Sequence, residues 1–342
     1  MSKANFNIED TVEKFSKIAH VVDFMIYLVK TISEHLSKLC ENLESLPDAF
    51  TILEAAGLID DVMNSMEGSA GLITKILSSI KKICDESKYY SLLSLHLALM
   101  FYHYDAWMLL RHSLLSAFIG YYSVAFTELR SAMESIVRGT VFDLLAIPQY
   151  RREAAELQKI KGFKNRAGFP ELLEVLEKRL GDRRLSTSIE IFAIIDEELK
   201  EFNPEASFIK LLKQLKAWKI IDEELFQEAD AHYAELSKHA HRIHPRFSEV
   251  GSRIIADKDW IELEPVPEEL SVYLHSFIDF NGLLTYLVLK VFSIDLVHEE
   301  YRSCIDWKAL EEDIQRASKL ARNHRTWKKT RDLLKELRSL TS

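Results

Sequence analysis

The scarcity of turn-forming residues is the feature of this sequence that most restricts its fold. Among 342 residues there are only 10 glycines and 7 prolines, roughly half or less of the average usage of each. An all-β fold needs frequent turns, and turns depend largely on these two residues. Apolar residues instead recur every three or four positions along nearly the whole chain, the period of amphipathic helices. The sequence therefore predicts an all-α protein, organised as a multi-helix bundle.

The helical pattern divides the chain into four predicted regions. These are N-terminal helices packing on the core (1–86), a central bundle (87–148 and 221–300), a more charged inserted helical region (149–220) and a basic C-terminal region (301–342). Within the last region, residues 307–340 are predicted to form one long amphipathic helix.

The most apolar stretch runs from Tyr89 to Thr127, and we expect it to form core helices. Asp105 and Arg111 interrupt it, whereas a membrane span needs about 20 predominantly apolar residues. Tyr89 to Phe118 is predicted to be one continuous helix. Its two histidines, His96 and His103, are interpreted as core side chains with satisfied hydrogen bonds.

Cysteine usage and charge indicate an intracellular protein. Cys40, Cys84 and Cys304 lie far apart with no paired spacing, so neither a disulfide framework nor a thiolate zinc site is expected. No secretory signal is recognised in the first residues, and a reducing cytoplasm is the expected compartment. The net charge of −9 argues against a general nucleic-acid coat.

The C-terminal region departs from this acidic average. From Lys308 to Ser342 there are ten Lys and Arg residues against five Asp and Glu, and several of the cations surround Trp327. A phosphate backbone or an acidic partner could bind there, which makes these residues nucleic-acid-binding candidates: Arg322, Arg325, Lys328 and Lys329. The alternative is a solvated basic face of a helix that packs through its apolar stripe.

A predicted helix from Asp222 to His244 carries a ladder of carboxylates and imidazoles. Glu228, His232, Glu235 and His239 follow one another at spacings of four, three and four residues, so they stack along one side of the helix. Such groups can bind zinc, iron or manganese, and the metal candidates are His232, Glu235 and His239. The alternative is a solvated face of Glu and His pairs.

A second ladder on the same helix borders its apolar side. Tyr233, Ser237 and His241 recur every four residues, and buried polar groups need partners. The predicted partners are charged residues at four-residue intervals on the apolar helix Tyr121 to Leu145: Arg130, Glu134 and Arg138. We expect the two helices to meet through these groups. Whether they only fix helix register or also bind a ligand or partner is left open by the residues.

The same residues carry a resemblance. The passage Tyr121 to Glu134, followed by Tyr233 to His241, resembles poorly characterised prokaryotic helical proteins with an Arg-x-x-x-Glu helix and a Tyr-x-x-x-Ser-x-x-x-His helix. These are reminiscent of the HEPN superfamily of helical domains. The resemblance implies a role in prokaryotic defence or stress for a site formed by Arg130, Glu134, Tyr233, Ser237 and His241. HEPN ribonucleases carry Arg followed by four to six residues and then His, and no arginine here has a histidine at that distance.

Three classes of function remain after these observations. The leading one is a non-catalytic intracellular binding or regulatory protein that uses the polar inter-helix site for a protein or small-molecule ligand. The second is an enzyme, either a divergent nuclease using His241 and Arg130 or a metal-dependent hydrolase using His232, Glu235 and His239. The third is a structural, self-assembling protein, since exposed helical stripes can form homo-oligomers. No residue is assigned a catalytic role, and no cofactor is implied.

Overall fold

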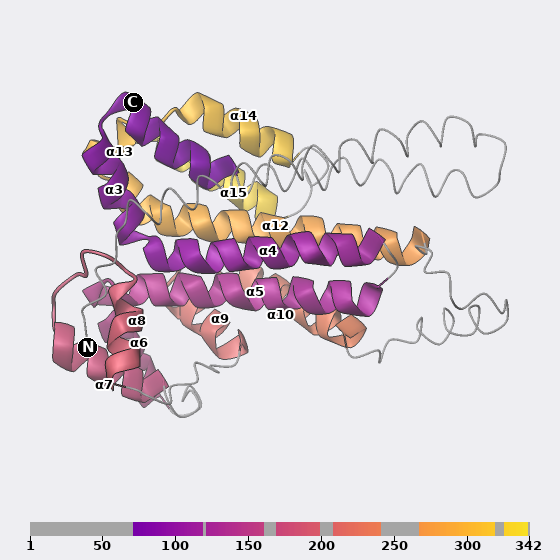
Figure 1. Cartoon of the computed structure of the whole chain (residues 1–342), viewed down its shortest axis with the longest axis horizontal. Coiled ribbons are helices and arrows are strands. Elements are labelled where there is room, and N and C mark those ends of the chain that lie inside the picture. Colours follow the sequence, from indigo (N-terminus) through magenta and orange to yellow (C-terminus); the bar gives the residue numbers. More distant parts are fainter. Residues whose placement is uncertain are drawn as a thin grey trace.

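The protein is all-α. The structure, a computed structural model, describes residues 71–118, 121–160, 169–198, 208–240, 267–318 and 325–340, and regular structure in these ranges is helical throughout. The predicted N-terminal helices before residue 71 lie outside these ranges. Three long helices run side by side along the longest axis, α4 (Leu97–Phe118), α5 (Tyr122–Leu145) and α12 (Pro267–Leu296) (Figure 1).

Helix α5 is the centre of the bundle because other helices cover most of its circumference. It packs against α4, α12, α9 (Phe208–Ala217) and α10 (Glu223–Ala240). Gly139 allows the closest of these contacts, since a Cβ atom at this position would overlap the Cβ of Tyr102 on α4. Sixteen residues of α5 are buried, Asp143 among them.

Helix α12 forms the other side of the core. By length and apolar composition, its segment Val272–Leu296 would reach across a membrane, but 78% of its most apolar window is buried inside the fold. That burial is the ordinary pattern of a core helix. Gly282 lies against the side chains of Thr326 and Trp327, where a Cβ would overlap both.

The predicted single helix from Tyr89 to Phe118 is wrong at one point, because the chain breaks at His96. Helix α3 (Glu86–Leu95) ends there, and α4 begins at Leu97. The backbone N–H of His96 bonds to Leu93 O, three residues back, as in a tightened last helical turn. The imidazole of His96 is buried between two carboxylates, which are described below.

The first three helices of the inserted region lie at the end of the bundle where α5 ends, whereas its last helix, α9, packs along α5 (Figure 1). Helix α6 (Pro148–Lys159) has its proline in the first turn, where the missing N–H costs nothing. Helices α7 (Phe169–Leu180) and α8 (Glu190–Glu198) follow. The buried Arg151 connects this region to α5, because its guanidinium donates to the carbonyl oxygens of Leu145, Gly181 and Arg183 at 2.8, 3.0 and 2.7 Å.

The predicted long C-terminal helix is corrected to two shorter ones, α14 (Trp307–Ala317) and α15 (Arg325–Ser339). Helix α14 ends at Ala317 with Ser318 as its C-cap, and α15 packs against both α14 and α12. The completely buried Trp327 anchors α15, and its Nε1 donates to Ile278 O at 3.1 Å. The apolar residues that were predicted to lie along one helix are therefore divided between two helices, which pack in separate interfaces.

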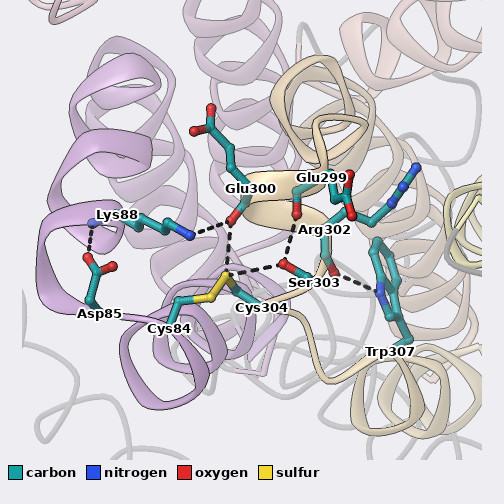
Figure 2. Close-up of a disulfide and its surroundings, with 9 residues drawn as sticks. All are labelled: Cys84, Asp85, Lys88, Glu299, Glu300, Arg302, Ser303, Cys304 and Trp307. Carbon is teal, nitrogen blue, oxygen red and sulfur yellow. Dashed lines mark hydrogen bonds between the residues drawn. A yellow bond between two sulfur atoms is a disulfide. The ribbon is translucent and has the colours of Figure 1, made fainter.

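The expectation of no disulfide is also wrong. Cys84 and Cys304, 220 positions apart, are bonded to each other with a Cα–Cα distance of 5.5 Å. Cys84 lies between the helix over residues 71–83 and α3, whereas Cys304 follows the short helix α13 (Glu299–Arg302) (Figure 2). The folded chain brings these distant segments together, which removes the argument from cysteine spacing for a reducing compartment.

Candidate functional site

Helices α5 and α10 bring three of the predicted site residues together. Asp222 directly precedes helix α10, and its carboxylate accepts the backbone N–H of Leu225 at 2.9 Å, which caps the first turn. The buried residues Leu225, Ala229 and Leu236 of α10 turn one face toward the core. Tyr233 lies beside this face and reaches the polar side of α5.

Glu134 is the centre of this group, which we call the Tyr233 site (Arg130, Glu134 and Tyr233). Its Oε1 accepts hydrogen bonds from the Tyr233 hydroxyl at 2.6 Å and from Arg130 Nε at 3.1 Å. The Arg130 guanidinium carbon also lies 5.2 Å from the centroid of the Tyr233 ring, within the range of a cation–π contact. The side chains of Arg130 and Glu134 are 27% and 30% exposed, so the site is open to solvent.

Phe208 holds the tyrosine ring in place. The two rings are stacked, with centroids 4.0 Å apart, and Phe208 is buried. Burial and the hydrogen bond to Glu134 raise the pKa of Tyr233 to about 12. Burial by itself would lower the pKa of Arg130, but its bond to Glu134 and its proximity to Tyr233 raise the pKa overall. Both groups therefore keep their protons at neutral pH.

The remaining members of the predicted site are not brought to Glu134 in the described ranges. Ser237 Oγ donates to the backbone oxygen of Tyr233 at 2.8 Å, a bond within its own helix. His241 lies outside the described residues. Arg138 lies near Tyr102 of α4, where its charge opposes the burial that raises the pKa of that tyrosine.

The fold keeps two of the predicted metal candidates, Glu235 and His239, next to each other and turns the third, His232, toward another helix. His232 Nε2 is 3.1 Å from the backbone oxygen of Ser276 on α12. The buried ring of His239 stacks on Phe126 of α5 with centroids 4.2 Å apart, and Glu235 lies 3.5 Å from its Nε2. Within the described ranges, no three His, Cys, Asp or Glu side chains form a group that could hold a metal ion. His232 and His239 are seven residues apart, about two turns along α10, and each contacts a different neighbouring helix, α12 or α5.

The predicted nucleic-acid-binding residues lie partly against acidic groups. Lys329 forms ion pairs with Asp222 and Glu224, and Arg325 is 3.9 Å from Glu224. Lys328 is exposed, whereas Arg322 lies outside the described residues. The acidic start of α10 therefore offsets two of the four cations.

A small pocket lies where α10, α12 and α15 meet, and it is lined by Glu228, His232, Asp279, Thr326 and apolar side chains. Its water-accessible space is about 30 Å³. Pockets for small organic ligands usually measure about 300–1,000 Å³, so this one has room for water but not for a metabolite.

A second polar group is the His96 network (Asp143, His96, Asp295 and Arg184). His96 was predicted to be a core histidine with hydrogen-bond partners, and it is buried, but its partners were not predicted. His96 Nδ1 lies 2.8 Å from Asp143 Oδ2, and its Nε2 lies 3.0 Å from Asp295 Oδ2. Arg184 donates to both oxygens of Asp295 at 2.9 and 2.7 Å. The side chains of His96, Asp143 and Asp295 are at most 3% exposed.

Electrostatic pairing outweighs burial in this network. Burial would lower the pKa of His96, but Asp143 and Asp295 raise it to about 9. Burial would raise the pKa of Asp295, whereas His96 and Arg184 move it well below its ordinary value. Asp143 and Asp295 each lie within an apolar helical segment of the sequence. Since a charge is buried only when it is paired, these two carboxylates were the signal that a buried partner exists.

Comparisons with known proteins give no relative for the chain. Family models, curated proteins and solved structures were each searched, and none matches.

Proposed function

We propose that this chain is a non-catalytic binding protein that recognises an anionic group of its partner at the Tyr233 site. The observation that carries the proposal is that Glu134 Oε1 accepts hydrogen bonds from both Arg130 and Tyr233. These bonds hold the two side chains in one arrangement, while Arg130 stays 27% exposed. Side chains fixed before binding lose less conformational entropy on association. An arginine held in this way is suited to carboxylate and phosphate groups.

The protonation of this site supports binding rather than proton transfer. A general base must lose its proton near the working pH. Tyr233, with a pKa of about 12, and Arg130, whose pKa is raised, both remain protonated at neutral pH. The divergent nuclease and the metal-dependent hydrolase remain alternatives without a supporting contact among the described residues.

The biological setting is part of the same proposal. The resemblance of Tyr121–Glu134 and Tyr233–His241 to HEPN-like prokaryotic proteins favours an intracellular role in defence or stress response. A regulatory protein of that kind needs a recognition surface, and the partly exposed Tyr233 site could provide one.

Calorimetric titration with anionic probes tests the proposal. The probes are inorganic phosphate, citrate, 5′-AMP and a short single-stranded RNA. We expect at least one to bind, and Arg130→Ala to weaken that binding at least about tenfold, because a hydrogen bond to a charged group contributes about 1.5–3 kcal/mol. The matched control is Arg152→Ala, which removes an exposed arginine of α6 that pairs with Asp182.

Three outcomes would contradict the proposal. The first is that none of the four probes binds. The second is that Arg130→Ala and Arg152→Ala bind equally well while both remain folded by circular dichroism. The third is cleavage of the RNA by wild-type protein, abolished in Arg130→Ala, which would favour the nuclease instead.

A further inference from the structure

The cysteine pair joins two segments that otherwise share few polar contacts. Beside the disulfide, Lys88 Nζ of α3 donates to Glu300 O at 3.2 Å (Figure 2). In addition, Ser91 Oγ lies 2.9 Å from the Tyr301 hydroxyl. The opposite end of α3 is held differently, through His96 and the carboxylates around it. The covalent link therefore restrains mainly the first turns of α3 and the segment around α13.

The two sulfur atoms differ in accessibility. Cys84 is partly exposed, and its chain neighbours Ile83 and Asp85 are exposed, whereas Cys304 is completely buried. Thiol–disulfide exchange begins when a thiolate attacks one sulfur of the bond, and access decides which sulfur is attacked. An incoming thiolate can therefore reach Cys84, and Cys304 is the leaving group.

The surroundings of Cys304 offer polar partners for a free thiol. Its Sγ lies 3.1 Å from Glu300 O, so a free thiol at the same place can donate a hydrogen bond to this carbonyl. Lys88 Nζ lies against the same oxygen at 3.2 Å (Figure 2). An ammonium group close to a sulfur stabilises the thiolate, which assists its departure during exchange.

We propose that Cys84 and Cys304 form a reversible redox latch between the start of α3 and the segment after α13. Reduction takes two thiols of a small thiol such as glutathione. The first thiolate attacks Cys84 Sγ, forms a mixed disulfide and releases the Cys304 thiolate, which takes a proton. The second attacks the glutathione sulfur of the mixed disulfide and releases the Cys84 thiolate, which takes a proton. The two glutathione sulfurs leave as glutathione disulfide, and both cysteines remain as thiols. Oxidation by glutathione disulfide is the reverse.

The latch is tested on the folded full-length protein. It is equilibrated with reduced and oxidised glutathione in varied ratio, then quenched in acid, alkylated and analysed by peptide mass spectrometry, with Cys40 as an internal thiol reference. We expect Cys84 and Cys304 to titrate together without denaturant. Reduction should speed amide exchange in residues 86–91 and 299–304 by about tenfold or more, as local opening does, and leave residues 122–145 unchanged.

Two variants make the result decisive. Cys84→Ser, at the partly exposed position, should show the exchange pattern of the reduced protein even with oxidised glutathione. Lys88→Met should slow reduction severalfold. A protein in which both thiols stay alkylatable at every glutathione ratio, in which the bond resists reduction until the chain unfolds, or in which reduction leaves amide exchange unchanged would overturn the latch.

Discussion

The His96 network and the Tyr233 site are both groups of charged and hydrogen-bonding side chains between helices, but they differ in contact with water. In the His96 network three side chains are at most 3% exposed and each charge faces an opposite charge. In the Tyr233 site Arg130 and Glu134 are about ten times more exposed, at 27% and 30%. Buried charges must be paired for the fold to form, whereas partly exposed ones can exchange a contact for a ligand. We therefore expect the first group to stabilise the fold, and we propose that the second recognises a partner.

The largest expected effect comes from opening the His96 network. Asp295→Ala removes the carboxylate that pairs with both His96 and Arg184 and leaves a buried imidazolium with one partner fewer. Urea unfolding should show a loss of about 3–5 kcal/mol, the usual cost of breaking a buried pair. Asp182→Ala, which removes a surface partner of Arg152, should change stability little. Equal losses in the two variants would contradict the contrast between the regions.

The next effect is a pH dependence carried by His96. Its pKa in the folded protein is about 9, above the ordinary value of 6.5. Between these two pH values the folded protein keeps the proton on His96, whereas the unfolded chain releases it. The associated stability is complete below pH 6.5 and is lost as pH rises toward 9, with a size on the order of 3 kcal/mol. Nuclear magnetic resonance titration of the His96 ring, with urea unfolding across this range, measures both quantities.

His103, two turns along the same stretch of chain, provides the opposite case. Burial lowers its pKa to about 4, so the unfolded chain binds this proton more readily. Stability from His103 is present above pH 6.5 and is lost as pH falls toward 4. A ring of His103 that titrates above pH 6.5 would show that desolvation does not dominate there.

A smaller effect is expected from the hydroxyl of the Tyr233 site. Tyr233→Phe keeps the stacking on Phe208 but removes the 2.6 Å bond to Glu134. The loss should be about 1 kcal/mol, as for a single hydrogen bond that water can partly replace. Chemical unfolding would detect it, and a loss as large as that of Asp295→Ala would place this hydroxyl in the stabilising group.

The smallest stability effect should come from Arg130→Ala. Its pair with Glu134 joins positions four apart on a partly exposed helix face, and such pairs contribute at most about 1 kcal/mol. Unfolding and probe titration on the same sample should show nearly unchanged stability with weakened binding. A clear loss of stability with unchanged binding would instead show that Arg130 serves to fix the register between α5 and α10.

The sequence predicted more of the fold than of the site. A helix was predicted from Tyr121 to Leu145, and α5 spans Tyr122–Leu145. Period and capping are local properties that can be read from neighbouring residues. Misjudged features were the break at His96, the division of the C-terminal helix and the Cys84–Cys304 bond. Each depends on a partner far away in the chain.

The sequence alone determined that this protein is all-α, because few glycines and prolines and a persistent helical period leave no other regular structure for so many apolar residues. Tertiary structure decided which polar residues belong together. Arg130 and Glu134 are one turn apart, but their contact with Tyr233 requires α10 to cross α5 at one register. Asp143 and Asp295 are 152 positions apart and meet only at His96. Burial and pairing are set by packing, and they decide whether a charge stabilises the core or remains available to a partner.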